Sequence, residues 1–133
     1  MTGFDLREPF VQGKEPITVM QSLLDWVTRE SRSLTPVFVG FNAGFEGFDW
    51  SFVNWYFHKF LGQNPFGVAP LDIKAYYMGL TGCSWEETRS SKLPEFLKVD
   101  QPERDRHNAL ADAVYQAEDF SRIKESRKGL SRL

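Results

Sequence analysis

Only two stretches of this chain have the composition of a β-strand. TPVFVGFN at residues 35–42 is rich in β-branched and aromatic residues, and VAPLDI at residues 68–73 contains a proline that only a sheet edge or an irregularity tolerates. Segments with helical periodicity precede, separate and follow these strands, so the order predicts an α/β layered domain. Two strands rarely make a stable sheet alone. Either residues 1–10 hide another strand, a partner supplies one, or the chain is the C-terminal part of a larger domain.

The helical segments differ in how much of their circumference is apolar. PITVMQSLLDWVTRES, from Pro16, has apolar residues at three- and four-residue steps, and Thr18 with Gln21 has the spacing of a capping box. FDWSFVNWYFHKFLG, residues 48–62, is apolar around most of its circumference, which predicts a helix buried between layers. Further expected elements are a helix over KAYYMGL that ends at Gly79 or Gly82, a short helix from the capping-box sequence SWEE at 84–87, a packed segment containing Leu93, Phe96 and Leu97, and a helix from Asn108 to about Lys124.

Length and charge limit the number of domains and the kind of function. The 133 residues suffice for one domain, with an irregular lead-in at 1–15 and a basic, flexible tail at 125–133. A net charge of −2 gives no overall basic field to attract nucleic acid, which argues against a simple nucleic-acid-binding module. A metal-dependent nuclease is compatible with this charge, because it needs carboxylates and its ions supply positive charge locally.

The cysteine content and the lack of long apolar runs indicate the compartment. Cys83 has no second cysteine with which to form an intramolecular disulfide, which is typical of a reducing compartment. No apolar run approaches the roughly 18–20 residues of a membrane helix, and residues 1–10 lack the pattern of a signal peptide. These features predict a cytoplasmic protein that does not associate with a membrane.

The stretch RDRHNALADAVYQAEDF, at residues 104–120, places a histidine just before a helical run. His107 precedes Asp112 by five residues, and Asp112 falls near the first turn of the predicted helix. A neutral imidazole at that point could take a proton from a water molecule while the carboxylate ligates a metal ion. The helix dipole alone also favours a carboxylate in the first turn, so the pattern by itself leaves both interpretations open.

Carboxylates also follow the two predicted strands, where open α/β sheets bind their ligands. Asp49 lies in NAGFEGFD after the first strand, and Asp72 ends the second. Each is also a natural N-cap of the helix that follows, and this structural role accounts for both. His58 has no acidic partner nearby in sequence, and the aromatic residues around it are more typical of a core than of a base-stacking surface.

Taken in order, these segments resemble the DEDDh family of 3′–5′ exonucleases, which have an RNase H-like fold. VFVGFNAGFEGFDWSFVNWYF is similar to the family's second motif, in which a strand and an asparagine precede Phe-Asp at the start of a helix; here these are Asn42, Phe48 and Asp49. RHNALADAVYQAEDF is similar to the third motif, His-x-Ala-x-x-Asp-Ala, and it matches every fixed position, beginning with His107. The resemblance extends over about residues 16–124.

The resemblance implies a mechanism and a set of site residues. His107 would be the general base that deprotonates the attacking water, and Asp112 and Asp49 would hold the catalytic Mg²⁺ or Mn²⁺ ions. Two ions about 3.5–4 Å apart would stabilise the attacking and leaving oxygens of the phosphodiester. Asn42 and Phe48 would contact a single-stranded DNA or RNA substrate at its 3′ end, from which nucleoside 5′-monophosphates would be released.

Two departures from the family pattern bear on activity. Three extra residues lie between Asn42 and Asp49, and Glu46 sits at the family's usual spacing, so Glu46 is an alternative to Asp49. The first motif, Asp-x-Glu, is not found. Asp5 and Glu8 are spaced Asp-x-x-Glu, which would place them on opposite faces of an extended strand.

The missing motif leaves three accounts of the chain open: an N-terminally truncated exonuclease domain, a split or degenerate exonuclease, or a non-catalytic remnant used for binding. We expect the chain to be an N-terminally truncated exonuclease domain of this family, and we leave open whether it is active. The rival expectation is a degenerate exonuclease fold that acts as an interaction module and forms a homodimer through surface left bare by the missing strands.

Overall fold

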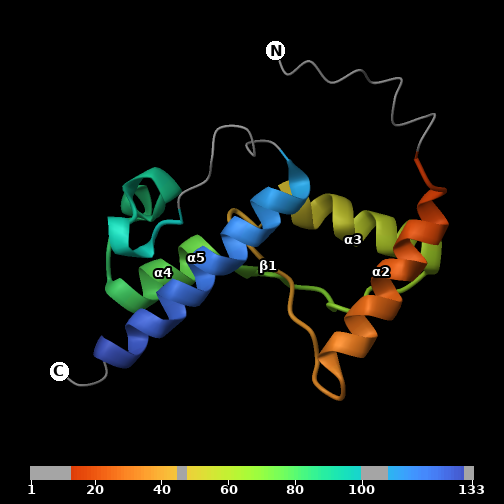
Figure 1. Ribbon diagram of the computed structural model, residues 1–133, viewed down its shortest axis with the longest axis horizontal. Helices are drawn as coiled ribbons and strands as arrows, with labels where there is room; N and C mark the ends of the chain where they lie inside the picture. The colour runs from red at the N-terminus through yellow and green to blue at the C-terminus, as the bar shows by residue number, and fades with distance from the viewer. Residues whose placement is uncertain (1–12, 45–47, 100–107, 131–133) are drawn as a thin grey trace, which may run out of the picture. The chain divides into compact units, whose positions relative to one another are not determined.

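The computed structural model describes residues 13–44, 48–99 and 108–130, the last three of these by their backbone alone (Figure 1). The described residues form two compact units. The first contains the chain up to Pro36 together with Phe52–Gly67, and the second contains Val37–Ser51 and the chain from Val68 onward. Among the described residues, no helix combines the length and the apolar character needed to cross a membrane.

In the first unit, helix α2 spans Pro16–Ser31, as the apolar periodicity predicts. Pro16 suits the first helical position, because its fixed φ is already helical and it lacks an N–H that would go unbonded there. The predicted capping box is wrong: Gln21 donates instead to the Asp25 carboxylate at 2.9 Å, one helical turn further on. The helix therefore begins without a side-chain cap.

Helix α3 spans Phe48–Leu61, and most of it, from Phe52 onward, belongs to the first unit. Phe57 is fully buried and contacts Phe66 edge to face at 6.0 Å between ring centroids. In contrast, Phe52 and Trp55 are more than half exposed, at 53% and 54%. The expectation of a helix covered on all sides is therefore wrong, because the described residues cover only the face that carries Phe57.

The second unit is built on two short parallel strands. Strand β1, Val39–Gly40, pairs with β2, Leu71–Asp72, in the register Val39↔Leu71 and Gly40↔Asp72. Both strands are shorter than predicted. The chain leaves β1 through a left-handed residue, Asn42 (φ 54°), and Ile73 already belongs to the helix that follows β2. The protein is thus a helix-rich α/β structure with a small parallel sheet, and the RNase H-like fold stays a prediction.

Helix α4, Ile73–Thr81, begins directly after β2 because Asp72 caps it. The Asp72 side chain accepts hydrogen bonds from the backbone N–H groups of Lys74 and Ala75, as predicted for an N-cap. Gly82, at φ 71°, ends the helix in the left-handed conformation that glycine adopts without strain. Of the two predicted helix ends, Gly82 is the correct one.

Three single-turn 3₁₀ helices connect α4 to the last helix: η1 Trp85–Thr88, η2 Ser90–Lys92 and η3 Glu95–Leu97. The predicted capping box of η1 is confirmed, since Ser84 and Glu87 satisfy each other's groups. Leu93 and Leu97 are buried as predicted, whereas Phe96 is 72% exposed. The prediction that Phe96 packs in the core is therefore wrong, because its side chain is largely exposed.

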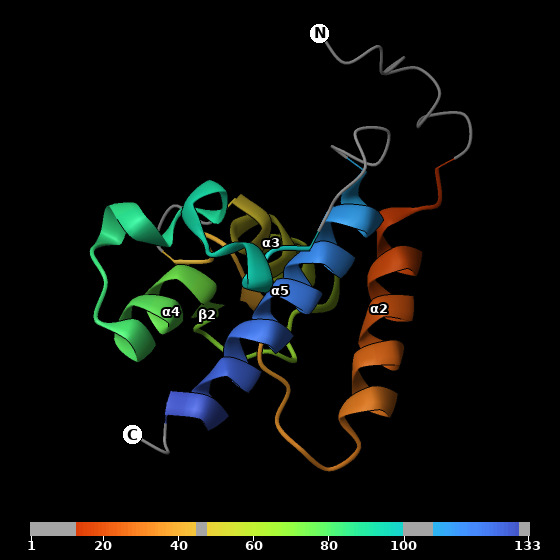
Figure 2. The same ribbon diagram turned by 60° about the vertical axis from the view of Figure 1, so that its left-hand side comes forward.

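Helix α5 spans Ala109–Leu130 and lies beside α4 (Figures 1 and 2). Ile123 of α5 is fully buried, and Phe120 contacts Tyr76 of α4 edge to face at 5.5 Å. The core of the second unit consists of Ile73, Tyr77, Leu93, Leu97 and Ile123. The helix continues to Leu130 rather than ending near Lys124 as predicted, and residues 131–133 lie outside the described residues.

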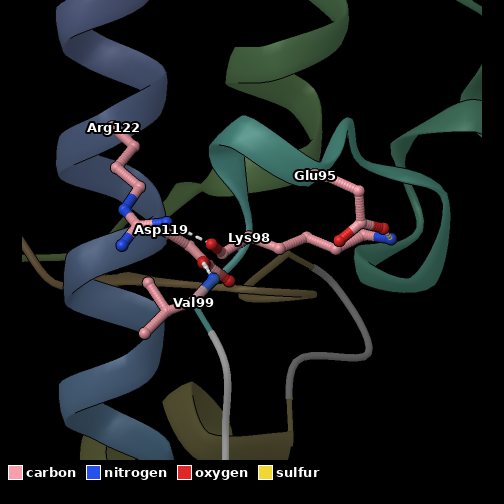
Figure 3. A network of polar contacts seen from close by, with 5 residues as sticks. All are labelled: Glu95, Lys98, Val99, Asp119 and Arg122. Carbon is pink, nitrogen blue, oxygen red and sulfur yellow. Dashed lines mark hydrogen bonds and ion pairs between the residues drawn. The ribbon is translucent and has the colours of Figure 1, made fainter.

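A polar network fixes the segment after η3 against α5 (Figure 3). The Asp119 carboxylate accepts a hydrogen bond from the Val99 N–H at 3.0 Å, and Arg122 donates to the Lys98 carbonyl. Burial raises the pKa of Asp119 above its ordinary value, and the Val99 hydrogen bond and the Arg122 charge oppose that shift. Val99 is the last described residue before Asn108, so the network anchors the chain on α5 shortly before the predicted His107 segment.

Candidate active site at the carboxyl end of the strands

The segment 41–44, directly after β1, is held by side chains from three other places in the chain. The Gln116 side-chain oxygen accepts a hydrogen bond from the Phe41 N–H at 2.9 Å. Asp72 accepts one from the Gly44 N–H at 3.2 Å with the carboxylate oxygen that does not cap α4. The Lys74 ammonium donates to the Asn42 side-chain oxygen at 3.1 Å. These bonds fix the backbone where the predicted second motif begins.

Because β1 and β2 are parallel, their carboxyl ends lie at the same edge of the sheet, and Asp72 and Asn42 follow those ends. Open α/β sheets gather ligands at this edge. Asn42 is exposed, and its positive φ of 54° is a conformation that asparagine tolerates better than most residues. The exposed Asn42 side chain is therefore available at the edge where a substrate would bind.

Helix α5 reaches the same edge through Gln116. Asp112 precedes Gln116 by one helical turn, so the two side chains lie on the same face of α5, about 6 Å apart along its axis. Asp112 is half-buried, as expected for a residue on the face that meets β1. Asp112, the carboxylate of the third motif, thus lies one helical turn from the residue of α5 that bonds to the segment after β1.

The start of α5 is set by Asn108. Its side-chain oxygen accepts a hydrogen bond from the Ala111 N–H at 3.0 Å, and its carbonyl accepts one from the Asp112 N–H at 2.8 Å. Asn108 is therefore the N-cap of α5, and His107 is the residue directly before it in sequence. His107 itself lies outside the described residues, and so does Glu46.

Asp49 is exposed in the first turn of α3, near the start of that helix. It is the second helical residue, because α3 already includes Phe48, so the predicted N-cap role is wrong for Asp49 although it is right for Asp72. An exposed carboxylate in a first turn is favoured by the helix dipole and is free to bind a cation. Of Phe48, the structure describes the backbone only.

The carboxylates of Asp49 and Asp112 have the oxygen donors that Mg²⁺ and Mn²⁺ prefer. Within ranges 13–44, 48–99 and 108–130, no group of three or more His, Cys, Asp or Glu side chains lies close enough to hold an ion. The described residues therefore fit a divalent ion in donor type but supply an incomplete ligand set. His58, exposed in the last turn of α3, is on the first unit.

Sequence reasoning missed two residues of this edge, Gln116 and Lys74. Gln116 lies in the third-motif helix, four residues after Asp112, and this spacing on one helix face is the signal that could have found it. Lys74 follows Asp72 by two residues, but its contact is with Asn42, far away in sequence. No local pattern predicts such a pairing.

Comparison with known proteins bears on the kind of protein to which this chain is similar. No family profile matches the chain. A search of curated proteins finds the 3′–5′ DNA exonuclease Cap18 of Escherichia coli, which is 48% identical over 125 residues. The match covers 92% of this chain and 64% of the relative, so the chain spans just under two thirds of the length of that protein. Over nearly its whole length, this chain is similar to a protein named as a 3′–5′ exonuclease.

Proposed function

We propose that this chain forms part of a 3′–5′ exonuclease of the DEDDh type that hydrolyses phosphodiester bonds at the 3′ ends of single-stranded DNA. The observation that carries the proposal is the pairing of Gln116 with the Phe41 N–H, which joins the third-motif helix to the end of the second-motif strand. The similarity to a 3′–5′ DNA exonuclease supports the reaction and favours DNA over RNA as the substrate.

In this proposal, Asp112 and Asp49 hold divalent metal ions, Mg²⁺ or Mn²⁺, and Glu46 is the alternative to Asp49. Such ions, when bound, stabilise negative charge on the attacking and leaving oxygens of a phosphodiester. The first turn of α5, capped by Asn108, holds Asp112 at a fixed position in the helix. This ordered backbone limits the positions from which the Asp112 carboxylate would bind a cation.

His107 is the proposed general base, which removes a proton from the attacking water. The Asn108 cap fixes the residue at which α5 begins. His107 and Asp112 are therefore separated in sequence by the cap and the first turn of the helix. Asn42 and Phe48 are the proposed contacts to the 3′ nucleotide. The Asn42 side-chain oxygen accepts a hydrogen bond from Lys74. The two N–H groups of the Asn42 amide are then the donors that would contact a substrate.

The family's first motif has no match in this chain. Asp112 and Asp49 alone are a weaker ligand set than the complete family site, so we expect slow hydrolysis or none from these 133 residues by themselves. Activity is expected once a segment with Asp-x-Glu is supplied. We propose the part of the Escherichia coli relative that the match does not cover as the source, on the condition that its sequence contains an Asp-x-Glu.

The test is a hydrolysis assay on 5′-labelled single-stranded DNA with Mg²⁺ or Mn²⁺, with EDTA as the metal-free control. The chain is compared with a chimera that adds the unmatched part of the relative. The proposal predicts a ladder of products shortened from the 3′ end for the chimera, and loss of that ladder in Asp112→Asn. Asp25→Asn, an exposed carboxylate of α2, is the matched control. A chimera without metal-dependent laddering would contradict the proposal, as would an active Asp112→Asn variant.

A second candidate function is a non-catalytic interaction module that forms a homodimer. One observation favours it, the exposed apolar side chains of the first unit, which include Trp26, Phe52 and Trp55. Large exposed apolar patches mark interaction sites, so these side chains are the candidates for a dimer contact. Size-exclusion chromatography with light scattering distinguishes the two, because a strictly monomeric, folded chain would count against the dimer.

A further inference from the structure

A cation, an amide and an indole ring gather beside the candidate active site. The Lys74 ammonium, which donates to the Asn42 side chain, also lies 4.2 Å from the centroid of the Trp85 ring. Lys74 comes from the first turn of α4 and Trp85 from the start of η1, and α4 and η1 pack closely in the second unit. A positive charge is therefore held at the carboxyl edge of the strands, next to a residue of the predicted second motif.

The Lys74 ammonium is held in place by an amide and an aromatic ring. Within the part of the chain that the structure describes, no carboxylate forms an ion pair with Lys74, whose contacts are Asn42 and the Trp85 ring. An ammonium has three N–H donors, and Asn42 takes one of them. The others are available to an anion, and the cation–π contact with Trp85 limits the side chain's movement beforehand.

The Trp85 ring offers a flat apolar surface at the same place. It is 48% exposed although it is one of the largest apolar side chains, and Lys74 lies over one of its faces. Nucleobases of any sequence stack on such rings, because every base has a π-face. A fixed cation next to an exposed ring is the combination with which single-stranded nucleic acid is bound: the cation contacts a phosphate and the ring contacts a base.

We propose that Lys74 and Trp85 form a binding site for single-stranded DNA next to its 3′ end, with Lys74 bound to a backbone phosphate and Trp85 stacked on a base. The inference rests on the proposed exonuclease function for the identity of the ligand. It explains how a chain of net charge −2 binds a polyanion, because a local cation replaces the missing overall basic field. Lys74 also joins this site to Asn42, the proposed contact to the 3′ nucleotide.

The test measures binding without hydrolysis. Fluorescence anisotropy of a 5′-labelled oligo(dT) is followed in EDTA, over a series of salt concentrations, with the full chain. Loss of one phosphate contact lowers the slope of log K against log salt by about 0.7 for single strands. Lys74→Gln is expected to show this change, Lys74→Arg to keep the parent slope, and Lys92→Gln, an exposed lysine of η2, to match the parent.

Trp85→Leu tests the stacking half of the site. It is expected to bind oligo(dT) at least about 5-fold more weakly with the salt slope unchanged, and to match the parent on an oligonucleotide of abasic sites. The inference is overturned if Lys74→Gln keeps both the affinity and the slope of the parent, if Trp85→Leu keeps the affinity, or if the parent chain does not bind oligo(dT). Far-UV circular dichroism checks that each variant is folded.

The two proposals fail separately. Binding that depends on Lys74 and Trp85 in a protein whose chimera shows no 3′ hydrolysis would overturn the exonuclease function and leave this site standing. Hydrolysis in the chimera together with unchanged binding by Lys74→Gln would overturn this site alone.

Discussion

The two compact units hold their segments in different ways. In the second unit, side chains bond to backbone groups far away in sequence: Gln116 to Phe41 across 75 residues, and Asp119 to Val99 across 20. In the described part of the first unit, the side-chain hydrogen bonds span shorter stretches, such as Gln21 to Asp25 within one turn of α2 and Asn64 to Asn54 ten residues apart. The Gln116 contact lies at the carboxyl edge of the strands, where a site needs fixed geometry, and the Asp119 contact holds the segment after η3 on α5.

Both units expose large apolar side chains, and the comparison between them concerns what they bury. The second unit has a buried cluster around the fully buried Ile123. The described part of the first unit buries Met20, Val27 and Phe57 and leaves these large apolar side chains exposed: Ile17, Val19, Trp26, Leu34, Phe52, Trp55 and Tyr56. The comparison indicates that the second unit has its own core. Substitutions in that core and in the polar contacts of the second unit test this conclusion.

The largest effect is expected from the core of the second unit. Ile123→Ala removes a fully buried side chain and leaves a cavity, so it should lower the free energy of unfolding by about 2–5 kcal/mol. Leu110→Ala, on the same helix but 75% exposed, is the matched control and should change it by less than about 0.5 kcal/mol. Urea denaturation followed by circular dichroism measures both. Equal effects of the two substitutions would show that α5 does not pack as described.

The next effect concerns the bond between α5 and β1. Gln116→Ala leaves the half-buried Phe41 N–H without its acceptor, so it should cost about 1–3 kcal/mol of unfolding free energy. Gln116→Glu keeps an acceptor and should cost less. Gln21→Ala removes a local, exposed hydrogen bond of the first unit and should cost less than about 0.5 kcal/mol. Amide hydrogen exchange at Phe41 gives an independent readout: unchanged protection in Gln116→Ala would contradict the contact.

A smaller, pH-dependent effect is expected at Asp119. Its folded pKa is raised above the ordinary value of 3.8, so the native state binds the proton more tightly than the unfolded state, and stability falls as the pH rises from about 3.8 through the folded pKa. Asp119→Asn keeps an acceptor for Val99 but does not titrate. Relative to the parent, this variant should therefore gain stability as the pH rises through that window and keep the gain above it. Denaturation between pH 4 and pH 7 tests the sign, which a constant or reversed difference would refute.

The smallest effect should come from Glu87, and its sign is opposite. Hydrogen bonds from Ser84 lower the pKa of Glu87 below its ordinary value of 4.5. Its contribution to stability is present above about pH 4.5 and is lost as the pH falls through the folded pKa. Glu87→Gln should therefore differ from the parent at neutral pH and approach it in acid. A difference between the two proteins that stays the same down to pH 3 would rule out the capping box as its cause.

Local patterns predicted the parts of the fold that local physics determines. The apolar period from Pro16 gave α2, Asp72 was correctly predicted as an N-cap, and Gly82 ended α4 as a left-handed residue. Strand lengths were overestimated because composition does not show where the partner strand ends, and pairing covers only Val39–Gly40 and Leu71–Asp72.

What could not be predicted depends on distant partners. The burial of α3 was overestimated because an apolar circumference does not show what is available to cover it, and Phe52 and Trp55 are exposed among the described residues. For the candidate site, the sequence nominates the motif residues Asn42, Asp49 and Asp112, and their roles stay predictions. Gln116 and Lys74, which fix the segment after β1, are recognisable only from contacts that cross most of the chain.

The most direct test of the account compares the two histidines of the chain. His107→Ala and His58→Ala are introduced into the chimera, and 3′-directed hydrolysis of 5′-labelled single-stranded DNA is measured with Mg²⁺. A general base contributes about 10²–10⁴-fold to the rate, so His107→Ala should lose activity by that factor while binding in EDTA is unchanged. His58→Ala, exposed on α3, should match the parent. Full activity in His107→Ala, or an equal loss in both variants, would contradict a catalytic site built from the third motif.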